Sequence, residues 1–267
     1  WMMPHHAAYV ICVAAAHEAA VRRELAELAA LTRVRPPAVA LAEREFTVGW
    51  RSFGVWALLL IGFFLWPQQS ALVEWGRVDA IAMVEQGQWW RAVTALTLHA
   101  DVVHLLSNLL AGAGFAWLVG RFFSAALGWC LIVLCGVGGN LLNAWVYYPA
   151  AHTSIGASTA VFAALGLLTG VGIWAALVAP ERHWSMSRWL LPLFGGLTLL
   201  GLLGTGAGRA NVDVAAHLSG FLCGLLVGAL AARLPALVLR LWRPLRWLLG
   251  GLPVALIALA WYQALAC

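Results

Sequence analysis

The sequence has no lysine and few charged residues of either sign. Charged residues make up 10% of the 267 positions, whereas hydrophobic residues make up 63%, and the mean hydropathy is +0.86. A soluble domain could not keep so much apolar surface away from water. The composition therefore excludes a soluble protein and indicates a chain that crosses a lipid bilayer several times.

The sequence also lacks paired cysteines and any excess of acidic residues. Cys130, Cys135 and Cys223 lie inside apolar runs and no CxxC pair occurs, so neither a disulfide framework nor a metal site is expected. The 16 basic residues, all arginine, exceed the 11 acidic ones. Arginines beside membrane spans hold loops in the cytoplasm, so the excess indicates membrane topology rather than nucleic-acid binding.

Seven apolar segments follow an amino-terminal stretch of different composition. The arginine-bearing residues 1–48 include AHEAAVRRELAELAAL (16–31), which predicts an amphipathic helix or a loosely held tail. Each apolar segment approaches the roughly 20 residues that cross a bilayer, and each is expected to be a helix because lipid offers backbone groups no partner. The segments are 50–67, 96–120, 125–148, 157–178, 189–204, 212–232 and 247–264, the last interrupted near its start by Gly250, Gly251 and Pro253.

The arginines predict how these helices are oriented. With a cytoplasmic amino terminus, the inner loops hold Arg121, Arg182, Arg188, Arg233, Arg240, Arg243 and Arg246, and the outer loops hold only Arg77, Arg91 and Arg209. This asymmetry follows the positive-inside rule. The predicted organisation is a cytoplasmic segment (1–48), a core of six membrane helices (49–232), and a basic cytoplasmic loop with an additional C-terminal helix (233–267).

Polar residues of three predicted helices share one depth in the membrane. Ser158 opens the fourth span in the stretch HTSIGASTAVF (152–162), His217 lies near the outer end of the sixth, and His104 and Asn108 lie one turn apart on the second. Ionisable residues inside spans are costly and usually mark function. A serine within reach of an imidazole is an activated nucleophile, which makes Ser158 and His217 candidates for catalysis.

Small residues indicate that these two helices pack closely. His217 is followed by Gly220, Gly224 and Gly228, a repeated small-xxx-small pattern that lets another helix approach. The fourth span offers glycine and alanine on its own surface. We therefore expect the fourth and sixth helices to be in contact.

Four motifs, in order, resemble those of the rhomboid intramembrane serine proteases. They are GQWWR (87–91), HADVVHLLSN (99–108), GAST (156–159) and AHLSGFLCG (216–224). The resemblance covers roughly residues 50–232. It implies a six-helix rhomboid-like membrane core, and a seventh helix after that core also occurs in relatives.

The resemblance implies a role for each residue that matches a motif. Ser158 would attack the scissile carbonyl, and His217 would take its proton and later protonate the leaving amine, as a Ser–His dyad without a third carboxylate. His104, Asn108 and the backbone N–H of Ser158 would stabilise the oxyanion. Phe162 would pack against the catalytic histidine. The remaining matches would support the site: Gly156, Gly220, Gly224, and the structural pair Trp90 and Arg91.

The resemblance also implies substrates and a location. The expected activity is cleavage of transmembrane segments of other membrane proteins, near a helix-weakening stretch and after a small side chain. Short loops and compact length indicate a multi-pass protein of a bacterial inner membrane. Substrate binding is expected to move the fifth helix (189–204) or the loop near 206–211. No metal, nucleotide or organic cofactor and no nucleic-acid partner is expected, and no oligomeric state follows from the sequence.

One residue departs from the family pattern and leaves a second function open. Thr159 follows the nucleophile where the family commonly has glycine, and a β-branched residue narrows the backbone choices there, although a helix tolerates it. It is the one feature that favours a catalytically inactive rhomboid-like protein that binds or chaperones membrane clients. A transporter would use the histidines as a proton path, but the polar residues stop in the outer half of the spans.

Simpler roles also remain open for individual residues. Ser158 could be a helix cap, and Asn108 could merely bond a neighbouring helix. Asp213, one turn before His217, would complete a triad, but it is expected at the outer water boundary. The remaining polar neighbours are expected to be loop or structural residues: His99, His152, Thr153 and Ser154.

Overall fold

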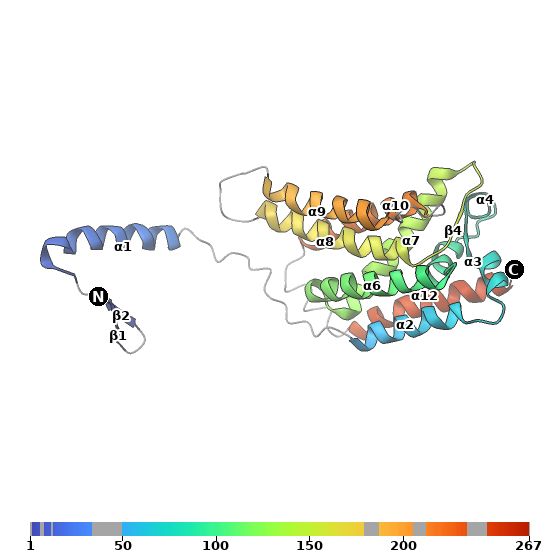
Figure 1. Cartoon of the computed structure of the whole chain (residues 1–267), viewed down its shortest axis with the longest axis horizontal. Helices are drawn as coiled ribbons and strands as arrows, with labels where there is room; N and C mark the ends of the chain where they lie inside the picture. The colour runs from blue at the N-terminus through green and yellow to red at the C-terminus, as the bar shows by residue number, and fades with distance from the viewer. Residues whose placement is uncertain are drawn as a thin grey trace. The chain divides into compact units, whose positions relative to one another are not determined.

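The computed structural model describes residues 2–5, 8–11, 13–33, 50–178, 187–204, 212–233 and 245–266 (Figure 1). The chain divides into two compact units. The first comprises Trp1–Ala42 with Ala179–Arg182, and the second comprises Glu43–Val178 with His183–Cys267.

The first unit contains a hairpin and a helix. Strand β1 (Met2–His5) pairs antiparallel with β2 (Ala8–Ile11). A 3-10 turn, η1 (Ala15–His17), leads into α1 (Glu18–Arg33), which covers the helix-forming stretch identified in the sequence. The hairpin was not expected, and residues 34–48 of the predicted segment lie outside the described residues.

The second unit has a helix in each of the seven predicted apolar segments. These helices are α2 (Trp50–Phe64), α6 (Val102–Phe123), α7 (Ala125–Tyr147), α8 (Ser158–Val178), α9 (Ser187–Gly204), α10 (Val214–Ala231) and α12 (Arg246–Ala266). Short elements connect them: α3 (Gln69–Gly76), α4 (Ala80–Glu85), α5 (Arg91–Thr94), η2 (Ala95–Thr97), and the two-residue strands β3 (Val78–Asp79) and β4 (Thr153–Ser154), which pair antiparallel.

Among the described residues, five helices are long and apolar enough to cross a membrane: α6, α7, α8, α10 and α12. The α2–α3 pair would make a sixth span, although the two helices are bent by 107°. The described apolar part of α9, Leu193–Leu203, is shorter. The prediction of an all-helical multi-span membrane protein is therefore confirmed.

Two predicted helix boundaries were wrong, and each has a local cause. The second span begins at Val102 rather than near residue 96, because Asp101 caps it: its Oδ1 accepts a hydrogen bond from the His104 N–H (2.7 Å). The first helix ends at Phe64, shortly before Pro67, which lacks a backbone donor. The last span, by contrast, continues through Gly250 and Pro253.

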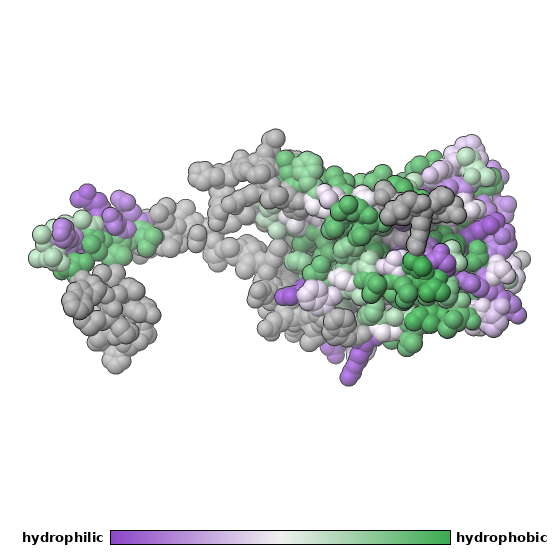
Figure 2. Space-filling view, viewed as in Figure 1, coloured by the Kyte–Doolittle hydropathy of each residue, from purple (hydrophilic) through white to green (hydrophobic). Residues whose placement is uncertain are grey.

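The surface of this unit has the pattern that a bilayer requires. Figure 2 shows hydrophobic residues over the side of the helix bundle and hydrophilic residues concentrated at the end that carries α3 and α4. Large apolar side chains such as Leu58, Leu110 and Leu226 are mostly exposed, as lipid-facing residues are. Strand β4, which leads into α8, lies at the same end as α4 (Figure 1).

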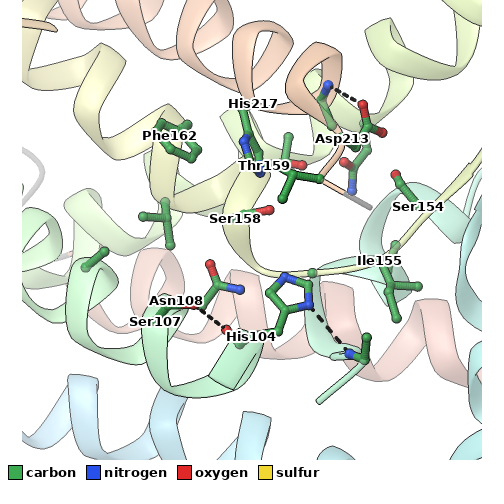
Figure 3. Close-up of a pocket in the computed structure, with 18 of the residues that line it drawn as sticks. His104, Ser107, Asn108, Ser154, Ile155, Ser158, Thr159, Phe162, Asp213 and His217 are labelled. Carbon is green, nitrogen blue, oxygen red and sulfur yellow. Dashed lines mark hydrogen bonds between the residues drawn. The ribbon is translucent and has the colours of Figure 1, made fainter. Parts of the chain in front are cut away.

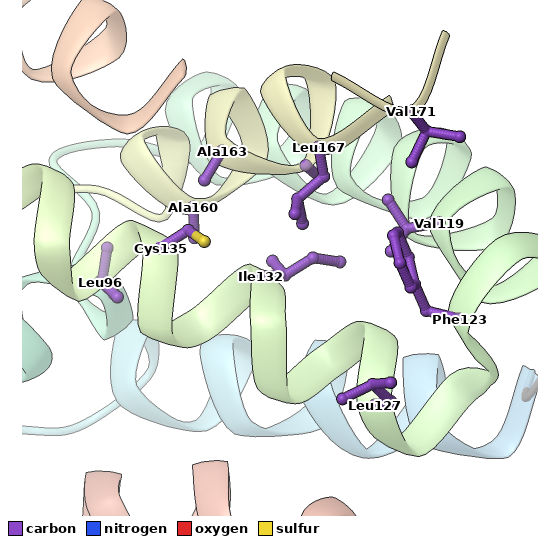
Figure 4. Close-up of a cluster of buried hydrophobic side chains, with 11 residues drawn as sticks. Leu96, Val119, Phe123, Leu127, Ile132, Cys135, Ala160, Ala163, Leu167 and Val171 are labelled. Carbon is purple, nitrogen blue, oxygen red and sulfur yellow. The ribbon is translucent and has the colours of Figure 1, made fainter. Parts of the chain in front are cut away.

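Helix α8 lies at the centre of the packing. Its residues Ala163, Leu167 and Val171 meet side chains of α6 and α7 in a buried cluster (Figure 4). It also contacts α10 through glycine, because a Cβ at Gly220 or Gly224 would collide with a backbone carbonyl of α8. The close approach predicted from the small-residue pattern is confirmed.

Gly224→Ala is expected to destabilise the protein, because the added methyl would meet the Ala163 carbonyl oxygen, which cannot move without shifting α8. Overpacking of this kind costs about 1–3 kcal/mol. Gly62→Ala on α2 is the matched control, because a Cβ there meets no atom within 4 Å. Thermal unfolding in detergent should show a lower midpoint for Gly224→Ala alone, and equal midpoints would contradict the packing.

Candidate active site

A cavity of about 470 Å³ brings together the four polar residues singled out in the sequence. Ser158, His217, His104 and Asn108 all line it, and they come from α8, α10 and α6. In Figure 3 the Ser158 hydroxyl lies between the His217 ring on one side and His104 and Asn108 on the other. Helix packing therefore places a hydroxyl, two imidazoles and a carboxamide around one space.

Gly156 determines the backbone path of the segment that leads into Ser158. Gly156 has φ +135°, a conformation that side-chain-bearing residues rarely adopt, and its N–H donates to the Ala95 carbonyl oxygen (2.9 Å). A Cβ at this position would lie 2.7 Å from Nε2 of His104. The His104 ring thus lies directly against the backbone that enters α8.

Gly156→Ala is expected to impair the site for both reasons, by straining the backbone and by displacing the His104 ring. A residue forced into such a conformation costs roughly 1–3 kcal/mol. We expect reduced reactivity of Ser158 toward an active-site serine probe, measured as a labelling rate. A labelling rate equal to that of the unaltered protein would contradict this geometry.

His217 is held by an aromatic contact with the helix that carries Ser158. The His217 side chain is buried, and its ring centroid lies 4.5 Å from that of Phe162 at an interplanar angle of 33°. Phe162 follows Ser158 by one helical turn, so the ring sets the position of the imidazole relative to the start of α8. The sequence-based expectation for Phe162 agrees with this contact.

Asn108 presents a hydrogen-bond donor that no described residue accepts. Asn108 is 5% exposed, and its Nδ2 is buried without a hydrogen-bond partner among the described residues. Such a buried donor is costly, so its presence calls for an explanation, and an acceptor on a bound ligand would provide one. Nothing in the described part of the chain supports the alternative that this donor bonds a neighbouring helix.

His104 is oriented by the chain around it. Its Nδ1 lies 3.5 Å from the Ala100 N, in a long hydrogen bond with that N–H, and its Nε2 faces Gly156. The neighbouring His99 ring meets it edge to face, with centroids 5.1 Å apart. The Nε2 side of the His104 ring therefore faces the segment that leads to Ser158.

Thr159 fits its place without distorting α8. It is buried, and its methyl group occupies space left by glycines on two other helices: a Cβ at Gly139 would lie 2.7 Å from it, and one at Gly220 would lie 3.0 Å from it. The departure from the family pattern is thus accommodated by close packing of α7, α8 and α10.

The matched pair of the first loop serves the fold. Arg91 donates to the Gln88 side chain (2.6 Å) and to the carbonyl oxygens of Glu74 (3.0 Å) and Arg77 (3.1 Å), so it joins α5 to α3. Trp90 packs against the buried cluster that α12 completes with Trp261. Both residues contact other parts of the fold, and neither is among the residues that line the cavity.

Sequence reasoning missed a polar cluster at the edge of the cavity, centred on Asp213, which lines the cavity itself. Asp213, expected at the water boundary, has a side chain only 13% exposed, and it caps α10 by accepting the Ala216 N–H (3.0 Å). His152, expected to be a plain loop residue, and Asn143 of α7 both bond the Asp213 carboxylate. No local motif marks this cluster, because its members are distant in the sequence. Among the residues that the structure describes, no group of three or more His, Cys, Asp or Glu residues is placed to hold a metal ion.

Comparison with known proteins gives the same family as the motifs. A model of the rhomboid domain matches residues 86–234, which is more than half of the chain. YdcA of Bacillus subtilis is 26% identical over 172 residues, which span 64% of this chain and 82% of YdcA. Rhomboid protease GluP of Bacillus subtilis is 27% identical over 182 residues, and RHOMBOID-like protein 1 of Arabidopsis thaliana is 31% identical over 169.

The extent of these matches differs between relatives. The aligned region covers 65% of this chain but 33% of GluP, and 61% of this chain but 40% of RHOMBOID-like protein 1. In each case the match exceeds half of this chain. On the family model, the four ordered motifs and the helical membrane fold, this protein belongs to the rhomboid family.

Proposed function

We propose that this protein is an intramembrane serine endopeptidase that cleaves transmembrane segments of membrane proteins with Ser158 as nucleophile and His217 as its base. The observation that carries the proposal is the shared cavity, which Ser158, His217, His104 and Asn108 all line. Family membership supports it, because relatives such as GluP are named rhomboid proteases.

The reaction follows from the chemistry of these groups. Ser158 Oγ attacks the scissile carbonyl carbon while His217 takes the hydroxyl proton, which gives a tetrahedral oxyanion. Asn108 Nδ2, His104 Nε2 and the Ser158 backbone N–H donate hydrogen bonds to that oxyanion. His217 then protonates the leaving amine, and the C–N bond breaks to leave an acyl ester on Ser158. Water, deprotonated by His217, hydrolyses the ester and restores the serine.

Substrates, location and orientation are part of the same proposal. The substrates are membrane proteins with a helix-weakening stretch near the outer surface and a small side chain before the cut. The protein lies in a bacterial inner membrane with its amino terminus in the cytoplasm, and residues 49–232 form the protease core. Arg182, Arg209, Arg240 and Arg243, which contribute to the orientation argument, lie outside the described residues.

Substrate entry involves α9. This helix contacts α8 where a Cβ at Gly196 would collide with Thr169, and its Leu203 lines the cavity. Movement of α9 would therefore open the cavity toward lipid. The loop near 206–211, the other expected moving part, lies outside the described residues.

Cleavage of a single-span reporter protein in lipid vesicles tests the proposal. Purified protein should convert the reporter into two fragments whose summed mass exceeds that of the reporter by one water, and Ser158→Ala should leave it intact. Intact reporter that co-purifies with folded wild-type protein would instead favour the client-binding alternative.

A further inference from the structure

A hydrogen bond joins the two chain segments that deliver Ser158 and His217 to the cavity. His152 Nε2 lies 2.7 Å from Asp213 Oδ2, and because an ionised carboxylate cannot donate, the imidazole N–H is the donor. The two residues lie far apart in the sequence. His152 belongs to the segment that enters α8 at Ser158, and Asp213 precedes His217 by one turn of α10.

Each partner is itself held in place. Asn143 of α7 donates to the same carboxylate oxygen (2.8 Å), while the other oxygen caps α10. The His152 ring stacks on Tyr147, with centroids 3.6 Å apart and an interplanar angle of 9°. The His152 carbonyl oxygen accepts from the Ala80 N–H (3.0 Å). The contact therefore joins α7, the β4 segment and α10 at defined points.

The surroundings favour a charged acceptor. The side chains of His152 and Asp213 are 18% and 13% exposed, so water competes little for the bond. Burial raises the pKa of the Asp213 carboxyl, but the hydrogen bonds from Ala216, His152 and Asn143 outweigh burial and hold that pKa below its ordinary value. Hydrogen bonds to an ionised acceptor are about twice as strong as neutral ones.

The position of this bond matters because dyad chemistry depends on the distance between hydroxyl and imidazole. Misplacement by about 1 Å can cost on the order of 10²-fold in rate. Ser158 begins one helix and His217 lies in the first turns of another, so their separation depends on what fixes the two helix starts relative to each other. The Phe162–His217 contact joins α8 and α10 within their first turns. The His152–Asp213 bond joins the segments that precede these two helices.

We propose that His152 and Asp213, braced by Asn143, are positioning residues that set the geometry of Ser158 and His217. The inference rests on the proposed function. These residues act through the dyad, so their loss lowers the turnover number with little effect on KM.

A double-mutant cycle on the reporter assay tests the inference. His152→Ala and Asp213→Asn should each lower kcat by roughly 10- to 100-fold, and the double variant should be little worse than either, because both remove the same bond. Asparagine still caps the helix, so Asp213→Asn spares α10. His152→Gln keeps a donor and should recover part of the loss. If His152→Ala does not fold, His152→Gln replaces it in the cycle with Asp213→Asn.

Ala151→Ser is the matched control, because residue 151 is exposed and adjacent to His152. A merely structural pair would lower the thermal midpoint but leave kcat unchanged well below it, and that result would overturn the inference. Additive losses in the double variant would also overturn it. Wild-type protein that neither cleaves the reporter nor reacts with a serine probe would instead overturn the proposed function, and the inference with it.

Acid unfolding provides an independent readout of the Asp213 charge. Because its pKa is lowered in the folded state, its contribution to stability is complete above the ordinary value of 3.8 and is lost as pH falls through the lower folded value. The difference in thermal midpoint between wild type and Asp213→Asn should therefore be largest near neutral pH and shrink in strong acid. A difference independent of pH would contradict a charged acceptor.

Discussion

His217→Ala is expected to lower the rate of reporter cleavage by about 10³-fold or more while the helix bundle stays folded. A serine hydroxyl is a weak nucleophile, and His217 is the imidazole that α10, the helix packed closely against α8, brings to the same cavity. The turnover number and the thermal midpoint should be measured on the same preparation, so that a loss of activity is separated from a loss of fold.

Two further variants make the result specific. Leu218→Ala is the control on the same helix, because Leu218 is 42% exposed and absent from the cavity lining, and it should cleave like wild type. Phe162→Leu should fall between the two, because it removes the ring that holds His217 but not the base itself. Cleavage by His217→Ala at a tenth of the wild-type rate would rule out His217 as the base.

Asn108→Ala is expected to reduce kcat by roughly 10²- to 10³-fold, the usual cost of removing one oxyanion donor. Its Nδ2 is buried and unpartnered among the described residues, so alanine removes a donor that the resting protein does not use. Stability should therefore change little, because loss of packing is partly offset by relief of the unsatisfied donor. The variant should therefore lose most of its kcat while its thermal midpoint stays close to that of the wild type.

Asn140→Ala provides the contrast for this variant. Asn140 is also buried, but its Nδ2 donates to the Ala92 carbonyl oxygen (2.9 Å), so its removal should lower the thermal midpoint clearly. If Asn108→Ala lowers the midpoint as much as Asn140→Ala and leaves kcat intact, Asn108 is a structural residue and the oxyanion assignment fails.

The parts of the fold that follow from local patterns were predictable. Apolar length located the helices, and the spacing of Gly220 and Gly224 indicated the α8–α10 contact because close approach needs small residues at helical intervals. The start of α6 was misplaced, since Leu96 and Leu98 extend the apolar pattern toward the amino terminus and the cap at Asp101 marks the actual boundary. The hairpin of β1 and β2 has no comparable signal in the sequence.

The candidate site divides in the same way. His104, Asn108, Ser158 and His217 could be grouped because helix rise places them at one depth, and the structure brings them to one cavity. The bond between His152 and Asp213 could not be predicted, because it depends on how the segment after α7 folds back toward α10. Whether the site tolerates Thr159 could not be predicted for the same reason, since Gly139 and Gly220 of other helices make the space for its methyl group.

Reaction with a fluorophosphonate probe tests most directly whether Ser158 is an activated nucleophile. Attack by Ser158 Oγ on phosphorus would expel fluoride, pass the hydroxyl proton to His217, and add one phosphonyl group to the protein. Intact mass followed by peptide mapping should find a single adduct on Ser158, absent from Ser158→Ala and strongly reduced in His217→Ala. Folded wild-type protein that stays unlabelled, or an adduct on another residue, would contradict the account.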